Sequence, residues 1–271
     1  MAVERTELEH YIAFERNPSL WRMFLRVSTA QSMARYRFAA GIISKQRGIT
    51  VDAASGSGWG TNYLSQQESG QVIGVDNNAR VVQQASDFFQ RRNLHFHKAD
   101  LRDPNAFAGI GGVSNITSFE TIEHVSREDA SVVLANFHSV HNGEGKLIIS
   151  TPNRSIFSPY HDTEGGPWDP FHLHEYDAPE FTSLLESNGW AVEELRGQAL
   201  CQPERYSAIT RAVHPFRKLS LMWGGARNSL LFCALVGIPT MLVATGFRNW
   251  DVHPLDSKRE PFYWVAVRSK K

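Results

Sequence analysis

The sequence predicts an α/β fold built on a seven-stranded, mostly parallel sheet with helices on both faces. Three observations predict this fold. An apolar segment beginning at Thr50 runs into a glycine-rich turn and then into a helix-compatible segment. Further short apolar runs follow at the intervals expected of alternating strands and helices, among them a helix at 179–188 and a strand at 190–195. A last apolar run, 261–267, predicts the final strand near the end of the chain.

The turn after the first predicted strand carries glycines in the pattern Gly-x-Gly-x-Gly, at Gly56, Gly58 and Gly60. Glycine lets the backbone adopt unusual dihedral angles and approach a ligand closely, where a side chain would block both. A parallel sheet presents such a turn at the carboxyl end of its first strand, next to a nucleotide-like ligand. Many nucleotide-binding folds share this pattern, so the residues that follow must discriminate between them.

Four more predicted strands each run into polar residues. The second, 71–75, is followed by Asp76, which is placed to accept hydrogen bonds from both hydroxyls of a ribose. The third, 94–98, leads to Asp100, whose carboxylate can accept from an adenine amino group, and to Leu101, which can pack on the ring. Because parallel strands end at the same edge of a sheet, we expect one ligand-binding rim. The fourth and fifth strands, 115–119 and 146–150, lead into the polar segments 120–125 and 151–154.

With this spacing the chain resembles the class I S-adenosylmethionine-dependent methyltransferases. The resemblance covers roughly residues 50–189 and the terminal strand 261–267. The competing dinucleotide-binding pattern is Gly-x-Gly-x-x-Gly, whereas here Gly-x-Gly-x-Gly begins four residues after Asp52. The family usually has glycine where Ala54 stands. We expect its methyl group to be tolerated provided that the backbone dihedral angles stay in the ordinary region.

The resemblance implies a Rossmann-like core, S-adenosylmethionine as the cofactor, and the positions that contact it. N-terminal helices of the family usually cover the cofactor, and the segment 35–39 is similar to a sequence common there. Tyr36 is therefore either a cofactor contact or a half-buried packing residue. The implied cofactor-binding set is Tyr36, Asp52, Ala54, Ser55, Gly56, Gly58, Asp76, Asn77, Asp100, Leu101, Phe119 and Glu120.

The length of 271 residues fits a core domain with attached segments. We expect residues 1–48 to form two or three helices that cover the cofactor site. The Rossmann-like core is predicted at 49–197 and 261–271. Residues 198–260 stand where the resembled family usually has a short hairpin, so we expect an inserted cap there.

The formal net charge is zero, but the charges are unevenly distributed. Residues 1–50 carry 8 Lys and Arg against 4 Asp and Glu, and residues 201–271 carry 11 against 4. Residues 51–200 carry 9 against 20. Either the solvated faces simply differ, or the basic flanks meet an anionic substrate or surface. A neutral chain without a recognisable RNA-binding module argues against nucleic acid as a partner.

Two cysteines give no disulfide framework, and the amino-terminal residues begin no apolar signal stretch. We therefore expect a cytoplasmic protein. An uncharged run at 228–247 has the length of a membrane span, but Gly237 and Pro239 interrupt it. The alternatives for this region are a substrate cap, a buried helix, a dimer contact in a homo-oligomer, or peripheral membrane contact through 211–247, where basic residues precede the apolar run.

The segment after the fourth predicted strand carries the candidate chemistry. Glu120, Glu123 and His124 stand at i, i+3 and i+4, so one helical turn would project all three to the same side. His172 follows later, in the motif Phe-His-x-x-Glu-Tyr. Carboxylates with imidazoles form a ligand set that suits Mg, Mn or Zn, so these four residues are the candidate metal ligands. Glu123, His124 and His172 are also the candidate catalytic residues, as acids or bases.

This arrangement resembles the metal-dependent small-RNA 2′-O-methyltransferases, in which a Glu-x-x-Glu-His motif meets a downstream histidine. The Glu-x-x-Glu-His part also resembles the ubiquinone-biosynthesis O-methyltransferases. Phe-His-x-x-Glu-Tyr is similar to a motif of bacterial methyltransferases that modify sugars and polysaccharides, where the histidine orients the substrate, acts as a base or braces the loop. A metal site and a histidine base therefore both remain open for His172.

O-methylation is the favoured reaction, because a hydroxyl acceptor gains from a base or a metal more than a nitrogen or carbon acceptor does. We expect a sugar or glycan hydroxyl as the acceptor, carried on a nucleotide or a lipid, with Tyr160 and Trp168 in a long loop either stacking on the sugar or packing the loop. The alternatives are a phenolic or quinone-like small molecule and RNA 2′-O-methylation. An idle cofactor-binding subunit and an NAD-dependent sugar-modifying enzyme are alternatives from other classes.

Overall fold

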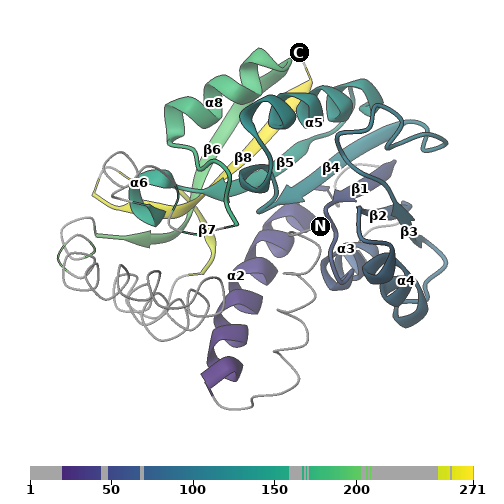
Figure 1. The fold of residues 1–271 in the computed structure, drawn as a ribbon, viewed down its shortest axis with the longest axis horizontal. Helices are drawn as coiled ribbons and strands as arrows, with labels where there is room; N and C mark the ends of the chain where they lie inside the picture. The colour runs from purple at the N-terminus through teal and green to yellow at the C-terminus, as the bar shows by residue number, and fades with distance from the viewer. Residues whose placement is uncertain are drawn as a thin grey trace.

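The computed structural model of the chain describes residues 20–43, 48–67, 70–158, 167, 169, 171–202, 206, 208, 250–256 and 258–270 (Figure 1). An eight-stranded sheet lies at its centre, in the order β3-β2-β1-β4-β5-β8-β6-β7. Strands β1 to β5 pair in parallel, and β8, β6 and β7 extend the sheet by antiparallel pairing. The strands are β1 (Ile49–Ala53), β2 (Val72–Asp76), β3 (Leu94–Lys98), β4 (Val113–Phe119), β5 (Leu147–Pro152), β6 (Trp190–Cys201), β7 (Val252–Pro254) and β8 (Glu260–Lys270).

Helices cover both faces of the sheet. Figure 1 shows α5 and α8 above the sheet, whereas α2, α3 and α4 lie below it. Helix α8 begins where the side chain of Asp177 accepts a hydrogen bond from the amide of Glu180, and it ends before Gly189, which has a φ of 84°. The helices are α2 (Leu20–Ile43), α3 (Trp59–Gln67), α4 (Ala79–Phe88), α5 (Arg127–Val140), α6 (Arg154–Phe157) and α8 (Ala178–Ser187), with a 3₁₀ turn η1 (Ile122–His124).

The core lies in two layers, one on each face of the sheet. Val51, Ile116 and Ile149 are fully buried in the layer that includes Phe137 of α5 and Leu185 of α8. The second layer contains residues of α2 and α3, among them Ile43 and Leu64, against Val72, Leu94, Ile148 and Val265 of the sheet. Strands that are covered on both faces need nearly continuous apolar runs, and this is why the central strands could be recognised in the sequence.

The predicted α/β class and the mostly parallel sheet are confirmed, but two details differ. The sheet has eight strands, because the short strand β7 lies inside the segment expected to be a cap. Strand β6 continues to Cys201, since its pairing with β8 extends from Trp190 to Cys201. Within the described part of the amino-terminal segment, residues 20–43 form one long helix, and the prediction of two or three helices for the whole segment stays a prediction.

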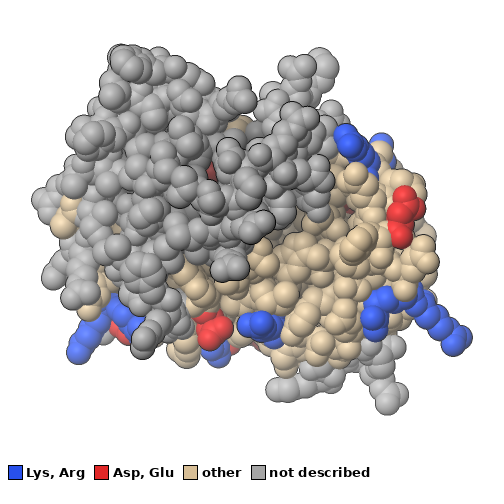
Figure 2. All heavy atoms as spheres, turned by 90° about the horizontal axis from the view of Figure 1, so that it is seen from below, with Lys and Arg blue, Asp and Glu red and all other residues tan. Residues whose placement is uncertain are grey.

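Several expectations concern residues outside those that the structure describes. These are Tyr160, Trp168 and the membrane-contact segment 211–247. Among the helices of the described residues, none combines the length and the apolar character that a membrane span requires. In the space-filling view of Figure 2, described side chains of both charge signs lie along the margin of the visible face.

Candidate active site

The turn after β1 is organised around the buried carboxylate of Asp52. This carboxylate accepts hydrogen bonds from the hydroxyls of Thr61 at 2.7 Å, Thr117 at 2.8 Å and Tyr36 at 3.0 Å. Burial raises the pKa of Asp52 to about 6, although the three hydroxyls oppose that shift. Asp52 therefore joins α2, α3 and β4 beneath the turn. Its predicted contact with a cofactor stays a prediction.

Tyr36 is held over the start of α3. Its side chain is 8% exposed, and a Cβ atom added to Gly60 would lie 2.1 Å from the tyrosine ring. The ring also makes edge contacts with Trp59 and Phe119. Gly60 is thus required by close packing against Tyr36, and Phe119 packs on the same tyrosine ring. The packing role expected as one alternative for Tyr36 is present in the structure.

The backbone of the turn departs from the sequence expectation at one residue. Ala54 has a φ of 60°, in the left-handed region, instead of the ordinary conformation expected for it. The reason is the geometry of the turn, because Gly56 and Gly58 also have positive φ, at 51° and 78°. An alanine in this region is strained by about 1–2 kcal/mol relative to an ordinary conformation. Ser55 is buried below the turn, and its hydroxyl has no hydrogen-bond partner in the described structure.

Asp76 lies at the tip of β2, as expected, beside the glycine turn. Its Oδ2 atom accepts a hydrogen bond from the amide of Gly56 at 2.9 Å, and its Oδ1 atom accepts from the amide of Asn78 at 2.9 Å. Each carboxylate oxygen keeps a further lone pair for a ribose hydroxyl. Asn77 is exposed next to it. This part of the predicted rim is assembled.

The part of the predicted rim that follows β3 is occupied by a contact between two protein side chains. The carboxylate of Asp100 forms an ion pair with Arg102, with an Nη2–Oδ2 distance of 2.6 Å. The hydrogen bond from Arg102 lowers the pKa of Asp100. Leu101 is buried beside it, at 8% exposure. A contact from Asp100 to an adenine amino group would therefore share the carboxylate with Arg102.

Glu120 does not join the predicted helical turn. Its φ is 53°, so the chain reverses at this residue and the 3₁₀ turn begins only at Ile122. The Oε1 atom of Glu120 accepts from the hydroxyl of Ser150 at 2.7 Å and lies 3.5 Å from Nη1 of Arg35. The expectation that one helical turn projects Glu120 together with Glu123 and His124 is wrong. Glu120 instead lies on the side of α2.

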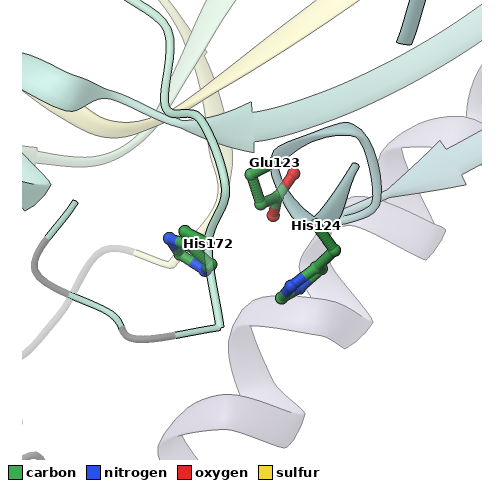
Figure 3. Close-up of side chains that lie close together, drawn as sticks. All are labelled: Glu123, His124 and His172. Atoms are coloured by element: carbon green, nitrogen blue, oxygen red, sulfur yellow. The ribbon is translucent and has the colours of Figure 1, made fainter. Parts of the chain in front are cut away.

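Three of the four predicted metal ligands do converge. Glu123, His124 and His172 each offer an oxygen or nitrogen atom, and these atoms lie within 4.8 Å of one another. Figure 3 shows Glu123 and His124 on the turn after β4, facing His172 on a separate segment of the chain. The backbone carbonyl of Glu123 accepts hydrogen bonds from the amides of Leu173 and His174, at 2.7 and 3.2 Å. These bonds fix the two segments against each other.

Hydrogen bonds at the Nδ1 atoms define the orientation of both imidazole rings. Nδ1 of His124 lies 3.0 Å from the carbonyl oxygen of Phe171, which only accepts, so this nitrogen carries the proton. Nδ1 of His172 lies 2.6 Å from Oε1 of Glu175 and donates to that carboxylate. The Nε2 atom of neutral His124 or His172 is then available to accept a proton or bind a cation.

The protonation of the cluster is shifted by burial and by neighbouring charges. Burial and the carboxylate of Glu120 raise the pKa of Glu123 to about 8. Burial opposes the charge on His172, but the hydrogen bond to Glu175 and the charge of Glu123 outweigh it and raise the pKa of His172 to about 9. Desolvation lowers the pKa of His124. Groups with shifted pKa values that meet at one end of a sheet are typical of catalytic sites.

Glu175 is a residue of this site that the sequence analysis did not select. It is fully buried, and its second carboxylate oxygen, Oε2, has no partner in the described structure. The signal was its position three residues after His172, within the motif already quoted. Thr151 and Ser150 were also missed, although they lie near the carboxyl end of β5 and their hydroxyls donate to Glu123 and Glu120.

The chain matches the methyltransferase domain family over residues 50–145, from β1 to the turn before β5. A protein of Mycolicibacterium smegmatis, described as a probable S-adenosylmethionine-dependent methyltransferase, is 34% identical over 148 residues. The matched segment covers 54% of this chain and 53% of that protein. The chain spans about half the length of the curated relatives it matches.

Solved structures share the fold. A methyltransferase from Archaeoglobus fulgidus, described as dependent on S-adenosylmethionine, superposes with a TM-score of 0.57 at 15% identity, over 92% of this chain and 99% of that one. The magnesium protoporphyrin IX methyltransferase of Synechocystis PCC 6803, solved with bound S-adenosylhomocysteine (SAH), gives a TM-score of 0.53 at 18% identity. That match covers 71% of this chain and 88% of that one. At these identities the likeness concerns the fold.

Proposed function

From the premise that residues 50–145 form a class I S-adenosylmethionine-dependent methyltransferase domain, we propose that the chain methylates a hydroxyl group of a sugar or glycan. The observation that carries this proposal is the pairing of His172 with Glu175 beside Glu123 and His124. This pairing supports a histidine base at the carboxyl end of the parallel strands, which is the edge that carries the glycine turn.

The residues after β1 and β2 fit the cofactor. S-adenosylmethionine, when bound, supplies a methyl group already activated on a sulfonium. Asp76 offers lone pairs for the ribose hydroxyls, and Gly56 beside it has open space where a side chain would stand. The buried hydroxyl of Ser55, which lacks a partner in the described structure, provides a further polar contact below the turn. The protein's task is then to align the acceptor and exclude water.

In its neutral form, which its pKa of about 9 makes dominant only at alkaline pH, His172 can take the proton of the acceptor hydroxyl. Its Nδ1 atom is bound to Glu175, so neutral His172 would receive the proton at Nε2. The resulting imidazolium is stabilised by the carboxylates of Glu175 and Glu123, and this is also why its pKa is raised. A sugar hydroxyl has a high pKa and gains from such a base, whereas a nitrogen or carbon acceptor gains less.

A divalent cation is the second device that the same cluster supports. Oε1 of Glu123 is buried and has no hydrogen-bond partner in the described structure. The Nε2 atoms of His124 and His172 are the ring nitrogens not used in the Nδ1 contacts, and Nε2 of His172 lies 3.9 Å from Oδ2 of Asp169. One carboxylate and two imidazoles, with hydrogen bonds at the far side of each ring, form a donor set that fits Mn or Zn better than Mg. Such a cation would lower the pKa of the acceptor hydroxyl and orient it.

The surroundings of His172 favour a sugar over a planar aromatic acceptor. The ring of Phe157 lies 5.7 Å from His172, and Tyr263 lies 5.7 Å from Phe157, so apolar ring faces stand next to buried carboxylates. Sugars present both an apolar face and hydroxyl donors, and this combination matches them. Phenols, quinone-like molecules and the 2′-hydroxyl of RNA remain the acceptors to be compared.

The test is a transfer assay with S-adenosylmethionine labelled in its methyl group. Wild type, His172→Asn and the matched control His174→Asn are offered free sugars, nucleotide-linked sugars, lipid-linked oligosaccharides, phenols and RNA. His174 is the control because it lies on the same segment but contacts Glu180 of α8. We expect labelled sugar from wild type and the control, and none from His172→Asn. If the label appeared only in phenols or RNA, the proposed sugar acceptor would be wrong. Full activity of His172→Asn would show that His172 is not the base.

A further inference from the structure

One stretch of the acidic middle of the chain is basic. Residues 51–200 carry 9 Lys and Arg against 20 Asp and Glu. Three of those 9 cations, Arg91, Arg92 and Lys98, fall within residues 88–99, which contain no acidic residue. This stretch forms the end of α4 and the whole of β3, the outermost strand on its side of the sheet (Figure 1). The cations are therefore concentrated at one edge of the molecule.

The same edge carries a groove with an apolar wall. The groove has a volume of about 630 Å³, within the range of small-molecule and headgroup sites. Its aromatic and aliphatic lining comes from Phe89, Leu94 and Phe96, and its cations are Arg91 and Arg92. The remaining lining residues are Ser86, Gln90 and His95.

An exposed aromatic side chain stands beside the groove. Phe88 is 80% exposed, and its ring centroid lies 4.9 Å from that of Phe89, which lines the groove. The acidic residues that flank the stretch in sequence are engaged elsewhere, since Asp87 accepts from Gln83 and Asp100 is paired with Arg102. Within the described residues, no ion pair joins either carboxylate to Arg91 or Arg92.

We propose that the groove between α4 and β3 binds the phosphate headgroup of an anionic lipid, so that this edge of the molecule contacts a membrane surface. Cations attract the phosphate, and an exposed aromatic ring next to them can enter the interface between headgroups and acyl chains. A nucleic acid tract would need cations spaced along an extended backbone, whereas here they gather around one groove. This site is remote in sequence from Glu123, His124 and His172 and does not depend on the proposed methyl transfer.

The experiment is flotation of the full chain with vesicles of phosphatidylcholine alone or mixed with phosphatidylglycerol, at low and high salt. The test variants are Arg91→Gln/Arg92→Gln and Phe88→Ser. The control, Arg127→Gln/Arg259→Gln, removes the same charge from two arginines that are 59% and 42% exposed on other elements. Circular dichroism of each variant establishes that it is folded.

We expect wild type and the control to float with the anionic vesicles, and salt to weaken that binding. The double arginine variant should bind roughly 30-fold more weakly, because each cation near an anionic surface contributes about a fivefold gain. Phe88→Ser should weaken binding with less dependence on salt. Equal binding of the anionic vesicles by wild type and the double variant would overturn the proposal, and so would an absence of binding to these vesicles. The proposal would also be overturned if the double variant lost only its binding to a single-stranded oligonucleotide, used as a competitor, and kept its binding to the vesicles.

Discussion

The Nδ1 atom of His172 lies 2.6 Å from the Oε1 atom of Glu175, and the two side chains are 7% and 0% exposed. A histidine whose Nδ1 atom is bound to a carboxylate presents Nε2 in a fixed direction. This hydrogen bond orients the imidazole ring of His172 and gives its protonated form a negatively charged partner. It is also local in sequence, since Glu175 stands three positions after His172.

Glu175→Gln should lower the pKa of His172 from its value of about 9. The glutamine oxygen can still accept the hydrogen bond, but the negative charge that stabilises the imidazolium is lost. Stability below the pKa of His172 should fall accordingly, because a group with a raised folded pKa contributes stability at low pH. The measurement is an NMR titration of histidine ring protons, with His174→Asn used to assign the neighbouring signal. An unchanged titration of His172 would contradict the charge pairing.

Glu123→Gln should weaken binding of Mn²⁺ at least tenfold, since it replaces the only carboxylate within the three-residue cluster. Calorimetry of the apo protein measures this directly. His174→Asn, on the same segment as His172, serves as the matched control and should bind Mn²⁺ like wild type. If wild type binds neither Mn²⁺ nor Zn²⁺, and a chelator leaves transfer unchanged, the cluster acts through its histidine base alone.

Ala54→Gly should raise the free energy of unfolding by about 0.5–1 kcal/mol. Glycine removes the strain of the 60° φ, and the greater freedom of the unfolded chain offsets part of that gain. Gly56→Ala is the opposite control, because Gly56 has a φ of 51° with no atom near an added Cβ. It should destabilise by about 1 kcal/mol. Urea unfolding of both variants checks the pair, and a destabilised Ala54→Gly would contradict the assignment of strain.

Asp52→Asn should flatten the dependence of stability on pH between about 4 and 6. The folded pKa of Asp52 is about 6, above the ordinary 3.8, so the folded state holds a proton that the unfolded state releases. Stability from this group is therefore lost as pH rises through that window, by an amount of the order of 3 kcal/mol. Urea unfolding at successive pH values measures the slope. An identical slope in wild type and Asp52→Asn would show that Asp52 is ionised throughout.

The central fold could be predicted because its signals are local. Strands Leu94–Lys98 and Val72–Asp76 stand within one residue of their predicted limits. The buried strand Val72–Asp76 is a short apolar run with a polar end, whereas the edge strand Leu94–Lys98 alternates apolar and polar residues. The turn with Gly56 and Gly58 was recognisable for the same reason. Strand β7 has only three residues, which are half-buried or exposed, so the sequence contains no apolar run that predicts it.

The parts that could not be predicted depend on contacts between distant segments. The positive φ of Glu120 moves it towards Ser150 and Arg35, 30 and 85 residues away, and no spacing rule at 120–124 reveals this. Nη1 of Arg35 also donates to Gln198 at 2.8 Å, across 163 residues. Contacts between residues that are far apart in sequence depend on tertiary packing, and a single sequence does not reveal tertiary packing.

The most direct test of the central claim is a calorimetric titration of the purified chain with S-adenosylhomocysteine, with NAD as the control ligand. We expect binding of S-adenosylhomocysteine and none of NAD. Asp76→Asn should weaken the binding roughly 10- to 100-fold, because it removes charge-assisted hydrogen bonds to the ribose while retaining the contact to the amide of Gly56. Asp87→Asn, on the exposed face of α4, should bind like wild type. Binding of NAD alone, or equal affinity in Asp76→Asn and wild type, would contradict the account.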